Sequence, residues 1–362
     1  MKTLSGLSTE YNGFTRPLAC IYVDGNLISG DFVIKSLEAE LSIYTKETGA
    51  AHFTVSCEPG EDGNPDTKLL LSSFPLMKKI RIEIGYEESE LQDVFEGYIF
   101  ERKLVIEPLF PGELYVSCLD CKALLRLNNA FTSYPAVAKY SELVSNVLSK
   151  YSAETQVDNS EAFDEPIVFN QNGLTDFDLI ATATAKTGFE FFAQGGKIFF
   201  RKRGNEKLLS LSKEGIFKAE YSNNLSGLYS DVKVIAYNRD NKEKQTISAA
   251  DPNKIGNGKT CKEILSEDAG ELSHKEQVNF GTLTQIDLNG FADAIFFENS
   301  IKLTEVTLHT KGIPILLPGY VVELEDIGDG IDNEYYIFAA RHKYDEKGYS
   351  SEIVCRSNTT VY

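Results

Sequence analysis

Residues 75–99 read PLMKKIRIEIGYEESELQDVFEGYI, and this stretch decides the fold. Isoleucine occupies every second position from 80 to 84, with charged residues between. A polar loop follows, and a second apolar run returns over residues 94–100. Alternation with a period of two predicts strands that bury one face and expose the other. The stretch therefore predicts a half-buried antiparallel pair.

A weaker copy of this pattern lies near the C-terminus. Pro318 precedes the alternating run 322–325, as Pro75 precedes the isoleucines, and a loop rich in Gly and Asp follows. The return run of each copy contains Tyr-Ile-Phe, at 98–100 and at 336–338. The repeat predicts two related β-units in one chain, so we expect the architecture to be a duplication.

Short strand patterns fill residues 17–125. Two apolar runs flank Asp24-Gly25, which supplies the positive φ angles that a type I′ hairpin turn requires. Residues 37–44 alternate, and a further strand-like run ends at Ser117. Many short strands separated by turns predict a barrel or a sandwich.

Helical periodicity appears only after Pro135. Apolar residues recur at helical spacing over 141–151, and Thr175 with Asp178 resembles a capping box at the start of a second helix. Gly188 is a suitable residue to end that helix. These patterns predict an α/β unit at 126–215, strands at 229–237 and 303–310, a polar, loop-rich stretch at 240–285 and a helix at 288–299.

The order and spacing of four segments resemble the hub proteins of contractile phage tails. The group includes the late control protein D family and the hub part of the VgrG-type spike proteins of type VI secretion. The resemblance extends from about residue 15 to about residue 357. The segments are Phe95–Ile99 (FEGYI), Ser117–Asp120 (SCLD), Asn170–Ile180 (NQNGLTDFDLI) and Leu317–His342, which begins LPGY.

This resemblance implies a mainly β fold with an α+β insertion: two related antiparallel β-barrels plus a small α/β domain. It also implies that the second barrel is discontinuous in sequence. The expected parts are a flexible N-terminal arm at 1–14, a first barrel at 15–125, a middle domain at 126–215 with the loop-rich 244–299, and a second barrel at 216–243 and 300–362.

The resemblance implies a structural role rather than catalysis. Three copies of a two-barrel chain would present six similar barrels, which would adapt a six-fold tail tube to a three-fold spike. The implied partners are the tail tube protein, the spike protein, other baseplate subunits and two further copies of the chain. We expect the copies to join either in solution or only on assembly with the spike or tube. Assembly would take place in the bacterial cytoplasm, and the product would be a tail baseplate or an injection-machine particle. Secretion spike proteins continue past the hub, whereas this chain stops at Tyr362, so we expect the spike to be a separate subunit or to be missing from this chain.

The composition excludes several classes of partner. A formal net charge of −18 argues against a nucleic-acid surface and against an anionic membrane. No apolar leader or membrane-spanning run is visible, so we expect no signal peptide and no membrane insertion. The six cysteines are thinly spread and are expected to be reduced and mostly buried.

No motif nominates a catalytic, cofactor-binding or metal-binding residue. Cys118 and Cys121 form a C-x-x-C without the surroundings of a redox pair. Residues 256–260 (GNGKT) imitate a phosphate-binding loop but lack its first glycine, because Asn253 stands there. The acidic loops at 58–66 and 326–332 lack the spacing of calcium ligands.

The four histidines, His52, His274, His309 and His342, are isolated in sequence and are expected to be structural. We therefore expect no enzymatic activity and no cofactor. A second hypothesis stays open: a cell-wall or carbohydrate-active enzyme or binding module that uses the acidic loops. Two carboxylates facing each other across a cleft at glycosidase separation would favour that hypothesis.

Overall fold

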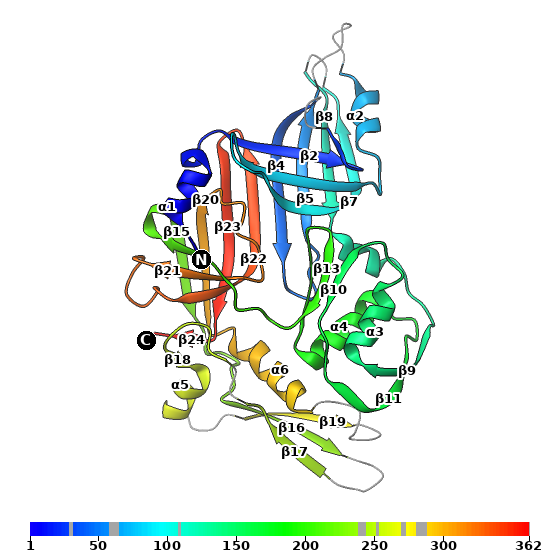
Figure 1. The fold of residues 1–362 in the computed structure, drawn as a ribbon, viewed down its shortest axis with the longest axis vertical. Coiled ribbons are helices and arrows are strands. Elements are labelled where there is room, and N and C mark those ends of the chain that lie inside the picture. The colour runs from blue at the N-terminus through cyan, green and yellow to red at the C-terminus, as the bar shows by residue number, and fades with distance from the viewer. Residues whose placement is uncertain are drawn as a thin grey trace.

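The computed structural model describes residues 1–28, 32–57, 65–107, 110–237, 244–250, 253–268, 273–279 and 288–361. As the sequence predicts, the fold is mainly β (Figure 1). Fourteen strands of the described chain form one continuous sheet, and smaller sheets flank it. The part of the acidic loop at 58–64 lies outside the described residues.

The first half of the large sheet, named here the N-terminal β-unit, contains six strands in the spatial order β4-β5-β8-β7-β6-β2, all antiparallel. Buried side chains from all six strands share one core, so the sheet curls around it. The β2–β3 turn at Asp24-Gly25 has the predicted positive φ angles. The elements are β2 (Pro17–Val23), β3 (Asn26–Leu27), β4 (Val33–Ser42), β5 (Ala50–Ser56), α2 (Thr67–Ser73), β6 (Lys79–Tyr86), β7 (Gln92–Val105) and β8 (Glu113–Leu119).

The second half, named the C-terminal β-unit, repeats this arrangement. Taken in chain order, its six strands correspond one by one to those of the first unit, and their spatial order, β15-β20-β23-β22-β21-β14, is the same. One pairing differs: β2 and β6 are antiparallel, whereas β14 and β21 are parallel. The strands are β14 (Lys207–Ser212), β15 (Ile216–Asn223), β20 (Thr304–Lys311), β21 (Val321–Glu325), β22 (Glu334–Asp345) and β23 (Gly348–Ser357).

The repeat extends to the register of individual residues. Ile99 lies opposite Cys118, and the ladder shifts by one residue immediately after Ile99. In the other unit Ile337 lies opposite Cys355, and the same shift follows Ile337. Both bulges thus fall on the phenylalanine of a Tyr-Ile-Phe triplet. The two copies found in the sequence are equivalent in three dimensions, which confirms the predicted relation between these strands.

A middle segment, residues 121–201, packs helices against short strands around a second core. Its second helix begins with the predicted capping box of Thr175 and Asp178 and ends at Gly188, which adopts a left-handed conformation. Polar caps of this kind satisfy backbone groups that a helix leaves unpaired. The elements are η2 (Cys121–Arg126), β9 (Ser133–Lys139), α3 (Tyr140–Leu148), β10 (Glu154–Val157), β11 (Ala162–Asn170), α4 (Asp176–Thr187), β12 (Glu190–Gln194) and β13 (Lys197–Arg201).

A further group of elements lies between β15 and β20 in the chain, below the C-terminal β-unit in Figure 1. The predicted strand at 229–237 is present as β16, but it pairs with β17 and β19 in a separate sheet rather than with the second barrel. The predicted helix at 288–299 is present as α6. The elements are β16 (Asp231–Tyr237), β17 (Lys244–Ser248), β18 (Lys259–Thr260), α5 (Cys261–Asp268), β19 (Ser273–Asn279) and α6 (Leu288–Ser300). Outside this group, η3 (Lys213–Gly215) lies between β14 and β15, and β24 (Thr359–Thr360) lies at the chain end.

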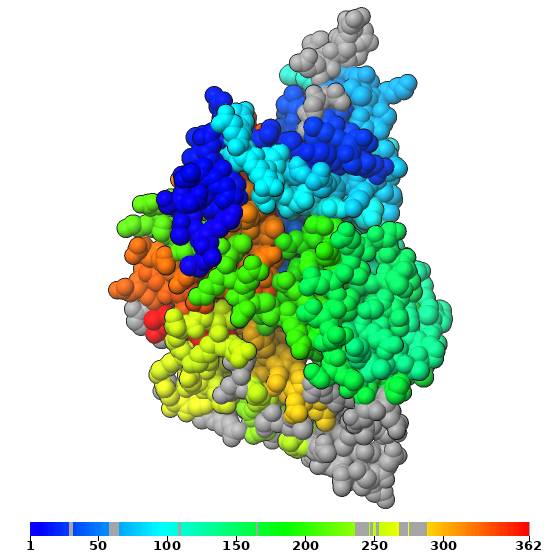
Figure 2. Space-filling view, viewed as in Figure 1, coloured from blue at the N-terminus to red at the C-terminus, as the bar shows by residue number. Residues whose placement is uncertain are grey.

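The N-terminal residues differ from the expected flexible arm. They form β1 (Lys2–Thr3), α1 (Leu4–Glu10) and η1 (Asn12–Phe14), and β1 pairs with β14. Leu7 and Tyr11 are buried in the core of the C-terminal β-unit. Figure 2 shows this segment, in dark blue, lying against the orange C-terminal strands. Burial of the apolar face of α1 holds the segment in place. The polar composition of residues 1–14 hid this apolar face from the sequence analysis.

The predicted division into domains stays a prediction, but two strands lie on the other side of its boundaries. β14 falls within the range predicted for the middle domain and yet pairs with β21. β16 falls within the range predicted for the second barrel and yet belongs to another sheet. A short strand pattern predicts a strand without specifying which sheet it joins.

Candidate assembly surface

The joint between the two β-units is a backbone ladder. β22 pairs antiparallel with β4 from Ala339 opposite Ser42 to Asp345 opposite Ser36. Arg341 Nη2 lies 2.6 Å from Glu40 Oε1, and Arg341 Nε lies 3.3 Å from Glu38 Oε1. The ladder makes the two units one continuous sheet, so a force on one unit reaches the other through hydrogen-bonded backbone.

Two of the strand edges that have no such partner among the described residues belong to β7 and β15. β7 pairs with β6 only up to Tyr98, so the outer edge of its second half carries no strand. β15 pairs only with β20. Apolar side chains stand beside both edges: Ile106 is 54% exposed and Phe217 is 67% exposed. Unpaired edges of this kind are ready sites for adding another strand.

A buried polar cluster connects the N-terminal β-unit with the middle segment. Asp120 accepts hydrogen bonds from the backbone N–H groups of Gly49, at 2.6 Å, and Lys122, at 2.8 Å. The Lys122 ammonium donates to backbone carbonyls, among them Thr45 at 3.2 Å and Phe191 at 3.3 Å. Burial raises the pKa of Asp120 to about 6 and lowers the pKa of Lys122 to about 8. These contacts tie the β4–β5 loop to strand β12.

A second buried cluster connects the middle segment with the C-terminal β-unit. The Glu190 carboxylate lies 3.3 Å from Arg201 Nε and 3.3 Å from Arg203 Nε. The hydroxyl of Tyr336 donates to Glu190 at 2.7 Å, and burial raises the pKa of Tyr336. Sequence reasoning missed both clusters, because charged residues are read as exposed unless a motif marks them.

The two cysteines of the C-x-x-C lie in different cores. Cys118 is buried in the N-terminal β-unit and Cys121 in the middle segment, and both are free thiols. Burial raises the pKa of Cys118, and it raises the pKa of Cys121 to about 12. Reactive thiols need a lowered pKa and access to solvent, so both cysteines have the character of core groups.

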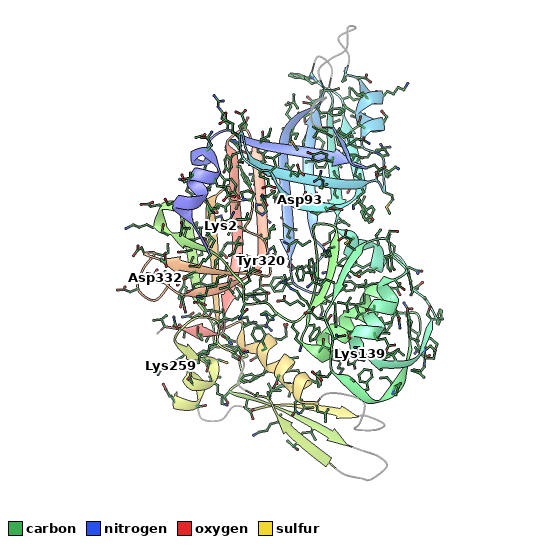
Figure 3. All side chains as sticks on the ribbon, in the orientation of Figure 1. Lys2, Asp93, Lys139, Lys259, Tyr320 and Asp332 are labelled. Carbon is green, nitrogen blue, oxygen red and sulfur yellow. The ribbon has the colours of Figure 1, made fainter. Side chains whose placement is uncertain are left out.

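The two loops that imitate ligand sites are engaged with the chain itself. In the 256–260 loop the backbone N–H of Asn257 donates to Asn333 at 2.7 Å, and Lys259 and Thr260 pair with β24. Figure 3 labels Lys259 and also Asp332, in the loop before β22. The Asp332 carboxylate accepts from the N–H groups of residues 326–328 at 2.9–3.1 Å. The described residues contain no cluster that could hold a metal ion.

The structure does not bring the four histidines together. His342 is fully buried, and its ring nitrogens contact the Tyr349 hydroxyl at 2.8 Å and the Leu316 carbonyl at 3.0 Å. Burial lowers the pKa of His342 to about 4, so it is neutral at pH 7. The other three bond or stack locally: His52 with Ser117, His309 with Glu352, and His274 with Tyr229.

A cavity of about 750 Å³ lies where the β4–β5 loop, α4 and α6 meet. Its walls are largely apolar and include Phe291 and Phe338, and Glu47, Glu190 and Glu298 also line it. Glu190 is committed to two arginines and a tyrosine, as described above. Of the three carboxylates that line the cavity, Glu190 is therefore engaged within the chain itself.

Solved structures of phage tail proteins share this fold. A 43 kDa tail protein of prophage MuSo2 from Shewanella oneidensis matches with a TM-score of 0.68 and 12% identity, covering 94% of this chain and 98% of that one. A tail protein from Neisseria meningitidis MC58 matches with a TM-score of 0.64 and 12% identity, covering 94% and 96%. The E. coli c3393 protein, described as a component of the type VI secretion system, matches with a TM-score of 0.60 and 10% identity, covering 92% and 76%. The chain thus has the fold of tail and spike-related proteins.

The family model described as the Alg8 N-terminal domain matches residues 19–346, and the chain belongs to that family. No curated protein matches the sequence of this chain. Among the described residues, no helix combines the length and the apolar character needed to cross a membrane.

Proposed function

We propose that this protein is a structural hub subunit of a contractile phage tail or a related injection machine, which adapts a six-fold tube to a three-fold spike. The observation that carries the proposal is the equivalence of the two β-units in strand order and bulge position. The shared fold with tail and type VI secretion proteins supports it. The duplicated strands predicted from the sequence would form the two barrels of that hub.

Equivalent units give a physical route to symmetry matching. Each chain offers two similar surfaces, so three chains arranged head to tail offer six. The rigid joints described above suit such an adapter, because backbone pairing and buried polar contacts hold the units in fixed relation. In this proposal the protein transmits force and performs no catalysis.

The proposed partners are two further copies of this chain, a tube protein, a spike protein and other baseplate subunits. A net charge of −18 per chain makes the copies repel at low ionic strength. We therefore expect trimerisation to strengthen with added salt or with a tube or spike partner. Assembly in the bacterial cytoplasm, before incorporation into the particle, belongs to the same proposal.

Sedimentation analysis in low and high salt, followed by electron microscopy of the largest species, tests this function. We expect a closed three-fold ring with near six-fold features, more populated in high salt. A chain that stays monomeric, or that forms an open filament, in low salt, in high salt and with a tube or spike partner present would contradict the hub role.

The alternative, a cell-wall or carbohydrate-active enzyme or binding module, has less support. The acidic loop at 326–332 turns its Asp332 carboxylate onto its own backbone. A zymogram against peptidoglycan separates the two proposals. Sustained hydrolysis that one point substitution abolishes would favour the enzyme and contradict the structural role.

A further inference from the structure

The joint inside the chain defines what an equivalent joint between two chains would look like. In the N-terminal β-unit, Ala39 of β4 lies opposite Ala51, which lies opposite Cys118. In the C-terminal β-unit, Tyr221 of β15 lies opposite Val306, which lies opposite Cys355. Because Cys118 and Cys355 are equivalent, Ala39 corresponds to Tyr221.

A second bulge confirms this alignment. The β4–β5 ladder shifts between Ile34 and Ser36, and the β15–β20 ladder shifts between Ile216 and Lys218. When Ala39 is aligned with Tyr221, Ile34 corresponds to Ile216 and Ser36 to Lys218, so the two shifts fall at equivalent positions. The matched triplets likewise align β7 with β22, so that Lys103 corresponds to Arg341 and Leu104 to His342.

We infer that β15 of one copy adds antiparallel to the outer edge of β7 of the next copy, in the register of the internal β4–β22 joint. In that register His342 lies opposite Ala39, so Leu104 lies opposite Tyr221 of the neighbouring copy, and Lys103 lies opposite Ser222. The inference rests on the proposed hub function, and it names the surface by which the copies join. The occupant of each free edge is a second copy of this chain.

The charges along the two edges are complementary in this register. Glu107 lies opposite Lys218, and both are exposed in the single chain. Lys103 lies diagonal to Glu220, as Arg341 lies diagonal to Glu38 in the internal joint. Opposite charges across strands stabilise a pairing, and like charges destabilise it. A register displaced by two residues would lose the Glu107–Lys218 match.

Ile106, the apolar side chain beside the β7 edge, also becomes buried in the inferred register. Ile106 corresponds to Tyr344, which packs on the core of the N-terminal β-unit opposite Leu37. Ile106 is 54% exposed in the single chain. In the inferred register it lies opposite Ala219, which packs on the core of the C-terminal β-unit. The contact between chains would thus bury an apolar residue at the position where the internal joint buries one.

Disulfide trapping tests the register directly. Cys20 is partly exposed, whereas the other five cysteines are buried, so the experiment uses a Cys20→Ser background. Lys103→Cys is combined with Ser222→Cys, which are directly opposite in the inferred pairing. The matched control combines Lys103→Cys with Asn224→Cys, two residues away on the same face, where the Cβ separation is too large for an unstrained disulfide.

Under mild oxidation in high salt, the Lys103→Cys, Ser222→Cys protein should form covalent species that end at three chains. The control should react on the order of tenfold more slowly. A mixture of the two single variants, Lys103→Cys and Ser222→Cys, should give covalent dimers only, because each chain then carries one reactive edge.

Charge reversal provides a second measurement. Lys103→Glu alone should weaken self-association about tenfold, and addition of Glu220→Lys should recover most of the loss. Lys347→Glu, at the exposed β22–β23 turn, is the control and should have little effect. A trimer that forms without the Lys103–Ser222 cross-link would overturn this inference and leave the hub function standing. The absence of any trimer, both in high salt and with a tube or spike partner, would overturn both.

Discussion

The N-terminal and C-terminal β-units have the same strand order but accept additions at different places. Between β4 and β5 the chain needs only residues 43–49, whereas between the corresponding β15 and β20 it runs through residues 224–303. The three-stranded sheet, α5 and α6 all lie in this second connection. The comparison teaches that the strand framework is fixed, whereas a loop at its end tolerates a large insertion.

The first strand of each unit also differs, and the difference follows from how the chain arrives. β2 approaches from the N-terminal segment and pairs antiparallel with β6, whereas β14 approaches from the middle segment and pairs parallel with β21. The other edge of β14 is covered by β1. An edge strand can be reversed without disturbing the inner five strands, because it shares only one ladder with them.

The polar cluster that follows β8 contains the ionisable groups of Asp120 and Lys122. The corresponding contacts after β23 are made by neutral groups. Asp120 corresponds to Ser357, because each follows its matched cysteine by two residues and each lies beside the matched strand start. Ser357 donates to the Ile255 carbonyl at 2.6 Å and contacts Thr359. We therefore expect the stability contributed by the Asp120–Lys122 cluster to depend on charge and pH, and the stability contributed by the Ser357 contacts to be insensitive to both.

The largest expected effect comes from disrupting the Asp120–Lys122 cluster. Lys122→Ala leaves Asp120 buried without its nearby cation and leaves several carbonyls without a donor. We expect the free energy of unfolding to fall by about 3–5 kcal/mol, measured by chemical denaturation. Lys347→Ala, at an exposed turn, is the control and should change it by less than about 0.5 kcal/mol. Equal stability of the two variants would show that the cluster does not hold the joint.

The pH dependence of this joint is the second way to sharpen the comparison. Burial raises the pKa of Asp120 from 3.8 to about 6, so in that window the folded chain binds more protons than the unfolded chain and stability falls as pH rises. Burial lowers the pKa of Lys122 from 10.5 to about 8, so in that window the unfolded chain binds more protons and stability rises with pH.

The measurement compares the native chain with an Asp120→Asn, Lys122→Met double variant. Relative to the variant, the native chain should lose about 1–3 kcal/mol between pH 4 and 6 and recover a similar amount between pH 8 and 10.5. Parallel stability curves for the two proteins across the whole range would contradict the assignment of both groups.

Gly97 offers a third test, because the N-terminal β-unit has no room for a side chain at a position where the C-terminal β-unit holds a large one. A Cβ at Gly97 would lie 2.2 Å from the Leu119 carbonyl oxygen, which belongs to backbone. The corresponding position of the C-terminal β-unit holds the buried Tyr335. We expect Gly97→Ala to lower the free energy of unfolding by about 1–3 kcal/mol. Gly328→Ala, where nothing lies within 4 Å, is the matched control and should be near neutral.

The sequence predicted the related strands because their signals are local and repeated. Alternating isoleucines and the Tyr-Ile-Phe triplets predicted the strands and their buried faces, and the structure adds an equivalent bulge at each triplet. The N-terminal helix was missed, although Leu4, Leu7 and Tyr11 recur at helical spacing and Thr3 caps the helix. The spacing was readable, but the surface that receives the helix is formed by strands distant in sequence, namely those of the C-terminal β-unit together with Tyr86 of β6.

The partners of β14 and β16 could not be predicted for the same reason. Each reads locally as a short strand, and the choice of sheet depends on long-range pairing. The burial of Lys122 is a further case, since lysine is rarely buried and its cage of carbonyls comes from two distant segments. The pairing inferred for the free edges of β7 and β15 likewise could not be predicted from the sequence, because it depends on the register of the β4–β22 ladder.

The smallest expected effect compares the two matched cysteines directly. Cys118 and Cys355 occupy equivalent positions beside equivalent bulges, and both are fully buried with a raised pKa caused by burial. Each side chain acts as a small apolar group, so Cys118→Ala and Cys355→Ala should each lower the free energy of unfolding by about 1 kcal/mol. The Cys118→Ser, Cys121→Ser double variant should still fold and assemble, because neither thiol has a redox partner in its core. A reduction potential near that of thioredoxins for this pair would contradict the structural reading. Unequal losses for Cys118→Ala and Cys355→Ala would show that the two cores differ in packing although their strands coincide.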